Sequence, residues 1–184
     1  ARELARLNSP CDAESLNAAL ASWHEVSATT LEERMALPLC LRLALWERLG
    51  ALLADLRRDL AETHRGRQLA KKLMGSRKPM AQLASCQLSD SCVDALLHTL
   101  RHAEHTTLLS ALNDHLAQQD ITPGEAALRH SRHQAMLAEG LVYAHTALTR
   151  LSTVDWPAAE EASDPLHLLF QEDPAAVYPA MTSQ

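Results

Sequence analysis

The 184-residue sequence predicts an all-α protein, a helical bundle of about five or six helices, and three observations support this. Leucine and alanine, which favour helices, dominate the hydrophobic residues, whereas aromatic residues make up only 3% and isoleucine occurs once, at Ile121. Five glycines leave little material for tight hairpins between strands. Apolar residues also recur every three or four positions over long stretches, which is the period of a helix with one buried face.

The N-terminal part of the chain contains signals for two helices. Asp12 is a suitable N-cap for the first helix, whose apolar face is expected to consist of Leu16, Leu20 and Trp23, and Trp23 is assigned to the core. Thr30 and Glu33 have the spacing of a capping box, which predicts that a second helix begins near Leu31. Pro38 would either kink this helix or begin a new one in its first turn.

Three longer helices are expected further along the chain. The first covers residues 39–74 and carries a broad leucine stripe, and Trp46 is in phase with that stripe and is assigned to the core. Gly66 would either end this helix or lie inside it. The second covers residues 92–119. The third covers residues 123–152 and is signalled by the capping sequence Thr122-Pro123-Gly124-Glu125.

The chain is predicted to change character after residue 153. Residues 1–153 are expected to form one helical bundle domain, and residues 154–184 an acidic, largely extended tail that four prolines interrupt. Within the tail, the apolar run Leu166 to Phe170 predicts a short docked helix at 165–171. No apolar run is long enough to span a membrane, and no signal peptide is visible. The first residue is not Met, so the chain is expected to be processed or a fragment.

Charge is distributed unevenly along the chain. The formal net charge is −6, and the region beyond Arg150, which has no Lys or Arg, contains six acids. No Asp or Glu lies between Thr63 and Leu88, a stretch that holds the basic segment of residues 65–78, namely Arg65, Arg67, Lys71, Lys72, Arg77 and Lys78. We expect this segment to bind a protein partner, a second copy or the chain's own acidic tail. Trp156 is expected either to anchor the tail onto the bundle or to be an exposed contact for a partner. A solvated helix end is the alternative, and the lack of an interleaved aromatic residue argues against nucleic acid.

Histidines are the candidate metal ligands. Imidazole with a nearby carboxylate is a usual ligand set for zinc, iron or manganese. The spacing of His98, His102 and His105 places them on a single face of the 92–119 helix. His130 and His133 lie on the next helix. The first three lie roughly opposite the leucines of their helix, which favours solvent-facing side chains without a metal. A contact face that responds to pH is the third interpretation.

Motifs for catalysis are not recognisable in the sequence. It has no nucleophile elbow, phosphate-binding loop or dinucleotide fingerprint, so an enzyme is the less favoured class and no cofactor is predicted. Cys86 and Cys92 match no zinc or redox spacing, which favours reduced thiols and a cytoplasmic location, with a secreted disulfide protein left open. The Ala- and Leu-rich, Gly-poor composition suggests a bacterial source.

Two hypotheses of function follow. The first is a protein-interaction module, such as an adaptor, a chaperone-like protein or a regulatory subunit, that acts through helix packing and the basic segment. The second is a metal-binding bundle that uses the five histidines. Chemical analysis of the metal content would separate the two.

Overall fold

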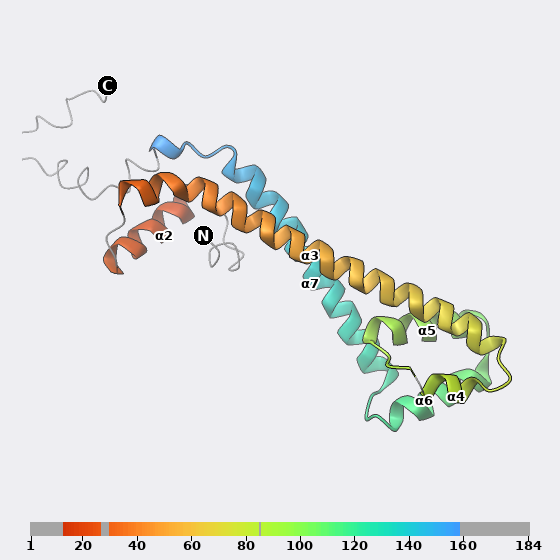
Figure 1. Ribbon diagram of the computed structural model, residues 1–184. Helices are drawn as coiled ribbons and strands as arrows, with labels where there is room; N and C mark the ends of the chain where they lie inside the picture. The colour runs from red at the N-terminus through yellow and green to blue at the C-terminus, as the bar shows by residue number, and fades with distance from the viewer. Residues whose placement is uncertain (1–12, 27–29, 85, 159–184) are drawn as a thin grey trace, which may run out of the picture. The chain divides into compact units, whose positions relative to one another are not determined.

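The computed structural model describes residues 13–26, 30–84 and 86–158, and this part of the chain is all-α (Figure 1). No strand occurs in these ranges, so the predicted fold class is confirmed. None of their helices combines the length and the apolar character needed to cross a membrane. The helices are α2 (Ala13–Val26), α3 (Leu31–Met74), α4 (Pro79–Ala84), α5 (Asp90–His102), α6 (Thr106–Ala117) and α7 (Pro123–Leu151).

The chain divides into two compact units. Unit 1 contains residues 1–50 and 140–184, and unit 2 contains residues 51–139. Helices α3 and α7 therefore each contribute residues to both units. The predicted acidic tail and its docked helix at 165–171 lie almost wholly outside the described residues, and both stay predictions.

Unit 1 is built from α2, the first part of α3 and the last part of α7 (Figure 1). α3 passes through Pro38 as one helix, although this proline cannot donate a hydrogen bond to the carbonyl of Arg34. The core forms where one face of α3 meets apolar residues of the other two helices, and it consists of Leu16, Leu20, Leu37, Leu41, Ala44, Leu45, Ala147 and Leu151.

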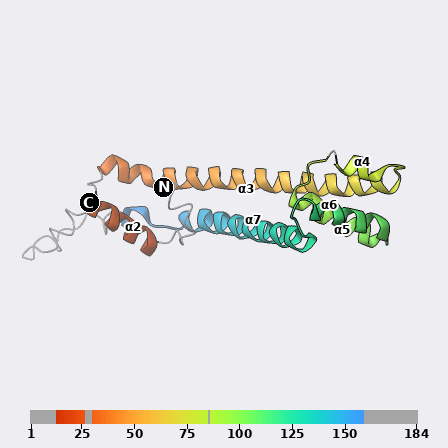
Figure 2. The ribbon, with the colours of Figure 1, turned by 90° about the horizontal axis from the view of Figure 1, so that it is seen from below.

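Unit 2 is built from the second part of α3, from α4, α5 and α6, and from the first part of α7; Figure 2 shows α5 and α6 beside the last turns of α3. Gly66 lies inside α3, and a Cβ atom at this position would lie 2.4 Å from the backbone oxygen of Cys92 in α5. The two backbones can therefore approach this closely only with glycine at this position. The core comprises Ala70, Leu73, Leu83, Val93, Leu96, Leu97, Leu100, Leu108, Leu112, Leu116 and Ala126.

Both capping boxes that the sequence predicts are present. At the start of α3, the backbone N–H of Glu33 donates to Thr30 Oγ1 at 3.2 Å, and the backbone N–H of Thr30 donates to Glu33 Oε2 at 2.9 Å. The same reciprocal pair joins Thr122 and Glu125 at the start of α7, with distances of 3.1 and 3.2 Å. The bonds from the backbone and hydroxyl of Thr122 lower the pKa of Glu125, because they favour its ionised form.

The single helix predicted over residues 92–119 is wrong, because the chain breaks it into α5 and α6. Glu104 adopts a left-handed conformation with φ of 51°. The N–H of Glu104 donates to the carbonyl of Arg101, and the N–H of His105 donates to the carbonyl of Leu100. These two bonds form a Schellman motif, which ends α5 without glycine. The apolar positions of both pieces nevertheless pack on the same core, where the buried leucines are Leu96, Leu97, Leu100, Leu108, Leu112 and Leu116.

Candidate interaction surfaces

The basic segment lies at the end of α3 and in the loop that follows it, within unit 2. The opposite face of α3 here packs on the core through Gly66, Ala70 and Leu73, at helical spacings of four and three. The six cations are all exposed, as the sequence analysis expects for a contact surface or a solvated helix end. The last turn of α3 is the negative end of the helix dipole, which the positive charges of Lys71 and Lys72 complement.

Arg65 differs from the other cations of the basic segment. One of its terminal nitrogens lies 3.3 Å from Glu62 Oε2, and the other donates to the backbone oxygen of Gln87 at 3.1 Å. Glu62 in turn accepts a 2.8 Å hydrogen bond from Ser89, the N-cap of α5. Arg65 therefore helps to hold the start of α5, and the remaining five cations are better candidates for binding a partner.

Trp156, the other predicted contact residue, lies in unit 1. Its side chain is half-buried and packs against the unit 1 core. The indole N–H donates to the backbone oxygen of Leu151 at 3.4 Å. Trp156 thus anchors the chain just after α7, which is one of the two roles expected from the sequence.

The structure separates the five candidate histidines. His98 and His102 are exposed on α5, with ring centroids 5.0 Å apart. His105 does not share their helix, because it is the N-cap of α6. His133 is exposed on α7, whereas His130 is buried. Within the described residues, no group of three or more His, Cys, Asp or Glu is arranged to hold a metal ion.

His130 belongs to a buried polar network in unit 2. It is 7% exposed, and Asp59 of α3 is 5% exposed. His130 Nε2 lies 3.3 Å from Asp59 Oδ2, and His130 Nδ1 lies 3.1 Å from Oδ2 of Asp94 in α5. Because a carboxylate oxygen can only accept, both contacts are hydrogen bonds at the same time only when both ring nitrogens carry a proton. His130 thus links α3, α5 and α7 through its two ring nitrogens.

Asp59 is held by further donors. The hydroxyl of Ser91 in α5 donates to Asp59 Oδ1, and Gln134 Nε2 of α7 donates to Oδ2 at 3.4 Å. Burial alone would raise the pKa of Asp59, but the hydrogen bonds from Ser91, Gln134 and His130 outweigh it and hold the pKa below its usual range. Ser91 contacts the carboxylate and not the imidazole, so the network contains no pair of nucleophile and base. Its residues stabilise the ionised carboxylate and fix the relative register of α3, α5 and α7 within unit 2.

Helix α3 presents a row of exposed apolar side chains in unit 1, which we call the α3 row. It consists of Met35, Leu39, Leu43 and Trp46, and each side chain is more than half exposed. The spacings of four, four and three place them on one helix face. The assignment of Trp46 to the core is therefore wrong. Leucine occurs on more than one face of α3, so being in phase with a leucine does not establish burial.

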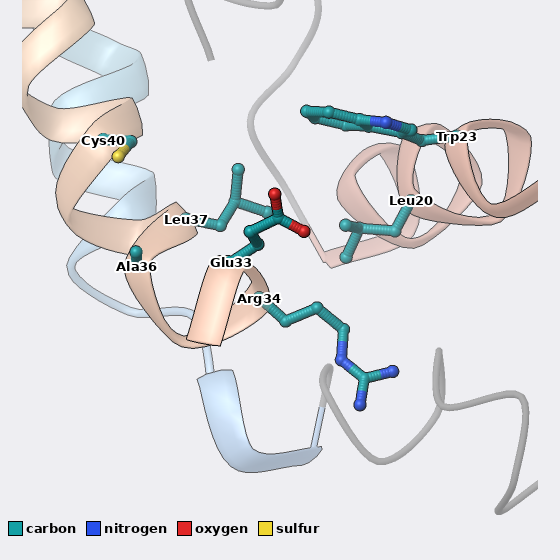
Figure 3. Close-up of a pocket in the computed structure, with 7 residues that line it drawn as sticks. All are labelled: Leu20, Trp23, Glu33, Arg34, Ala36, Leu37 and Cys40. Carbon is teal, nitrogen blue, oxygen red and sulfur yellow. The ribbon is translucent and has the colours of Figure 1, made fainter. Parts of the chain in front are cut away.

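A cavity of about 300 Å³ lies between α2 and α3 in unit 1 (Figure 3). Trp23 lines it and is about half exposed, so its assignment to the core is also wrong. In Figure 3 the rings of Trp23 and the side chain of Leu20 face Leu37 and Cys40 across the hollow. The complete lining is Leu20, Trp23, Glu33, Arg34, Ala36, Leu37 and Cys40.

The sequence alone predicts neither the α3 row nor the cavity. The burial of Asp59 and His130, by contrast, can be recognised from their spacing. Asp59 lies seven residues from Gly66, and Gly66 lies seven residues from Leu73, so all three share the core-facing side of α3. His130 likewise lies seven residues before the buried Leu137. A polar residue at a core-facing position of a helix is a detectable exception.

The chain matches no protein-family model, and comparisons with curated proteins and with solved structures find no match.

Proposed function

We propose that the chain is a protein-interaction module, an adaptor or regulatory subunit, that binds a helix of its partner along the α3 row. The observation that carries the proposal is the row itself, since four large apolar side chains on one helix face exceed what a solvated surface needs. Anchors spaced three and four residues apart are what a packed helix presents to a second helix. The partner is therefore expected to contribute an amphipathic helix.

The basic segment supports a second contact in the same module. Arg67, Lys71, Lys72, Arg77 and Lys78 are exposed, and the sequence around them lacks acids. An acidic protein surface is the partner chemistry that complements them, and the acidic tail of the chain would compete with it. We place the module in the cytoplasm, because the described cysteines are free thiols.

A pair of matched substitutions tests the α3 row. Leu43→Glu places a charge in the row, and Val142→Glu places the same charge at an exposed apolar position of α7 in the same unit. We expect partner proteins that co-purify with the native chain to be retained by Val142→Glu and lost by Leu43→Glu. An anchor residue at a helix interface contributes about 2 kcal/mol, so the affinity should fall roughly 30-fold. Equal recovery by the two variants, at unchanged thermal stability, would contradict the proposal.

The basic segment is tested by charge reversal. The double substitution Lys71→Glu and Lys72→Glu should weaken binding of the partner. It should also make the affinity depend less on salt concentration, because salt then screens fewer pairs of opposite charges. Arg57→Glu, at an exposed position of the same helix in unit 2, is the control and should leave that dependence unchanged. An identical salt dependence in all three proteins would remove the basic segment from the proposed surface.

A metal-binding bundle is the second candidate function, and the adjacent rings of His98 and His102 favour it. Two histidines four residues apart on a helix can bind one metal ion together. Chemical analysis of untagged protein should then find close to one zinc or similar ion per chain, and His98→Ala should abolish it. A content far below one ion per chain would contradict this function without bearing on the α3 row.

A further inference from the structure

The cavity between α2 and α3 is open toward the apolar side chain of Trp23 and toward the thiol of Cys40, both of which are exposed. We propose that its occupant is a segment of the same chain, residues 165–171, with the sequence Pro-Leu-His-Leu-Leu-Phe-Gln. This goes beyond the proposed function, because it concerns the cavity and not the α3 row. It gives the cavity a self-ligand, a short apolar helix.

The chemistry of the segment matches that of the cavity. Leu166, Leu169 and Phe170 have the spacing of three and four that places them on one face of a helical turn. Phe170 is the only phenylalanine in the chain. A volume of about 300 Å³ accommodates an aromatic side chain, and burying one removes about 150–250 Å² of apolar surface from water. The walls that would receive it are Leu20, Trp23 and Leu37.

The path of the chain brings the segment within reach. The backbone oxygen of Leu151 accepts a 3.5 Å hydrogen bond from Arg42, so α7 ends beside that residue of α3. The cavity residues Leu37 and Cys40 precede Arg42 by five and two positions, and five residues of helix are only about 7.5 Å long. Trp156 then holds the chain close to Leu151. The ten residues from Trp156 to Leu166 can span up to roughly 33 Å, which exceeds the required distance.

The tether also favours this occupant over a second copy of the chain. A segment joined to its site by a short tether has an effective concentration on the order of millimolar there. A separate molecule at micromolar concentration would need an affinity higher by that ratio to displace it. The segment at residues 1–12 joins α2 at Ala13 and offers Leu4 and Leu7 but no aromatic residue. It is the weaker chemical match to the cavity.

The thiol of Cys40 reports on the occupancy of the cavity. Docking of residues 165–171 covers Cys40, so its alkylation by N-ethylmaleimide should be slow in the full-length chain. Phe170→Glu should raise that rate about tenfold, since a docking equilibrium of that size is lost with the aromatic anchor. Phe170→Ala should give the same rise without adding charge. Cys86 in unit 2 provides the internal reference, and its rate should not change in either variant.

Tyr178→Glu is the matched control, because it makes the same kind of change elsewhere in the tail. It should leave the Cys40 rate at the value of the unaltered chain. Equal Cys40 rates in the unaltered chain and in both Phe170 variants would overturn the proposal. Acceleration by Tyr178→Glu as large as that by Phe170→Glu would also overturn it, since the tail would then act as a whole. Protection that disappears on dilution would identify a second copy as the occupant, and acceleration by Leu4→Glu would identify the N-terminal segment.

Discussion

The two parts of α3 use their exposed and buried faces differently. In unit 2, the core-facing side of α3 carries Asp59 and Gly66, each of which fits only one arrangement of its neighbours. In unit 1, the core-facing side is purely apolar, and the opposite side carries the α3 row. Apolar packing tolerates small shifts, whereas a buried carboxylate and a close backbone contact do not. Unit 2 is therefore the region with the more strictly defined packing, whereas unit 1 holds the α3 row, four exposed apolar side chains at spacings of three and four on one helix face.

The largest test of this contrast uses two glycines of the same helix. Gly66→Ala should destabilise the protein by about 3 kcal/mol, because the new Cβ would meet the Cys92 backbone oxygen, which no side-chain rotation can move. Gly50→Ala should stabilise it by about 0.5–1 kcal/mol, since nothing lies within 4 Å of the new Cβ and alanine favours a helix. Chemical denaturation of both variants measures the two free energies. Effects of the same sign would remove the distinction between the two parts of α3.

The next test addresses the buried carboxylate. Asp59→Asn should cost about 2 kcal/mol at neutral pH, because it weakens hydrogen bonds to a charged group and leaves His130 with one acceptor fewer. A comparable loss in Asp94→Asn would contradict this ranking, because the side chain of Asp94 is 42% exposed and water can replace its contact.

Asp59 also makes the stability of the protein depend on pH. Its pKa is lower in the folded than in the unfolded chain, where it lies near the ordinary value of 3.8. The stability that it contributes is therefore complete above about pH 4 and is lost as the pH falls through the lower, folded-state pKa. Acid titrations of unfolding should show a steeper loss for the native chain than for Asp59→Asn. If the free energy of unfolding falls equally with pH in the native chain and in Asp59→Asn, protonation of Asp59 is not coupled to folding.

Local signals predicted the helix starts well. The two capping boxes depend on four residues each and on hydrogen bonds that close within one turn, so no knowledge of the tertiary fold was needed. The core positions of α5, α6 and α7 were also predictable, because their apolar spacing is unambiguous. In α3, by contrast, leucines occupy several faces, and only the neighbouring helices decide which face is buried. The exposure of Trp46 could therefore not be derived from its spacing.

The polar network shows a second limit. Residue type alone groups His130 with the exposed histidines, whereas its spacing to Leu137 marks it as core-facing. The partners of His130, Asp59 and Asp94, lie 71 and 36 residues away in sequence, and no local pattern connects them. Spacing could thus have predicted burial of His130 but not its pairing.

The smallest predicted effect concerns the turn between α5 and α6, which the sequence analysis did not predict. Only backbone hydrogen bonds hold Glu104 within the described residues, so its side chain is not required there. Its backbone has a left-handed conformation, which costs a non-glycine residue about 1–2 kcal/mol. Glu104→Gly removes this cost and adds back part of it as unfolded-chain entropy, so a net gain of about 0.5 kcal/mol is expected. Asp120 has the same conformation, with φ of 55°, but aspartate tolerates it better, so Asp120→Gly should gain less. Thermal unfolding of both variants ranks them. A loss of stability in Glu104→Gly would mean that the turn between α5 and α6 is fixed by its side chain, and the strictly defined packing of unit 2 would then extend to its surface turns.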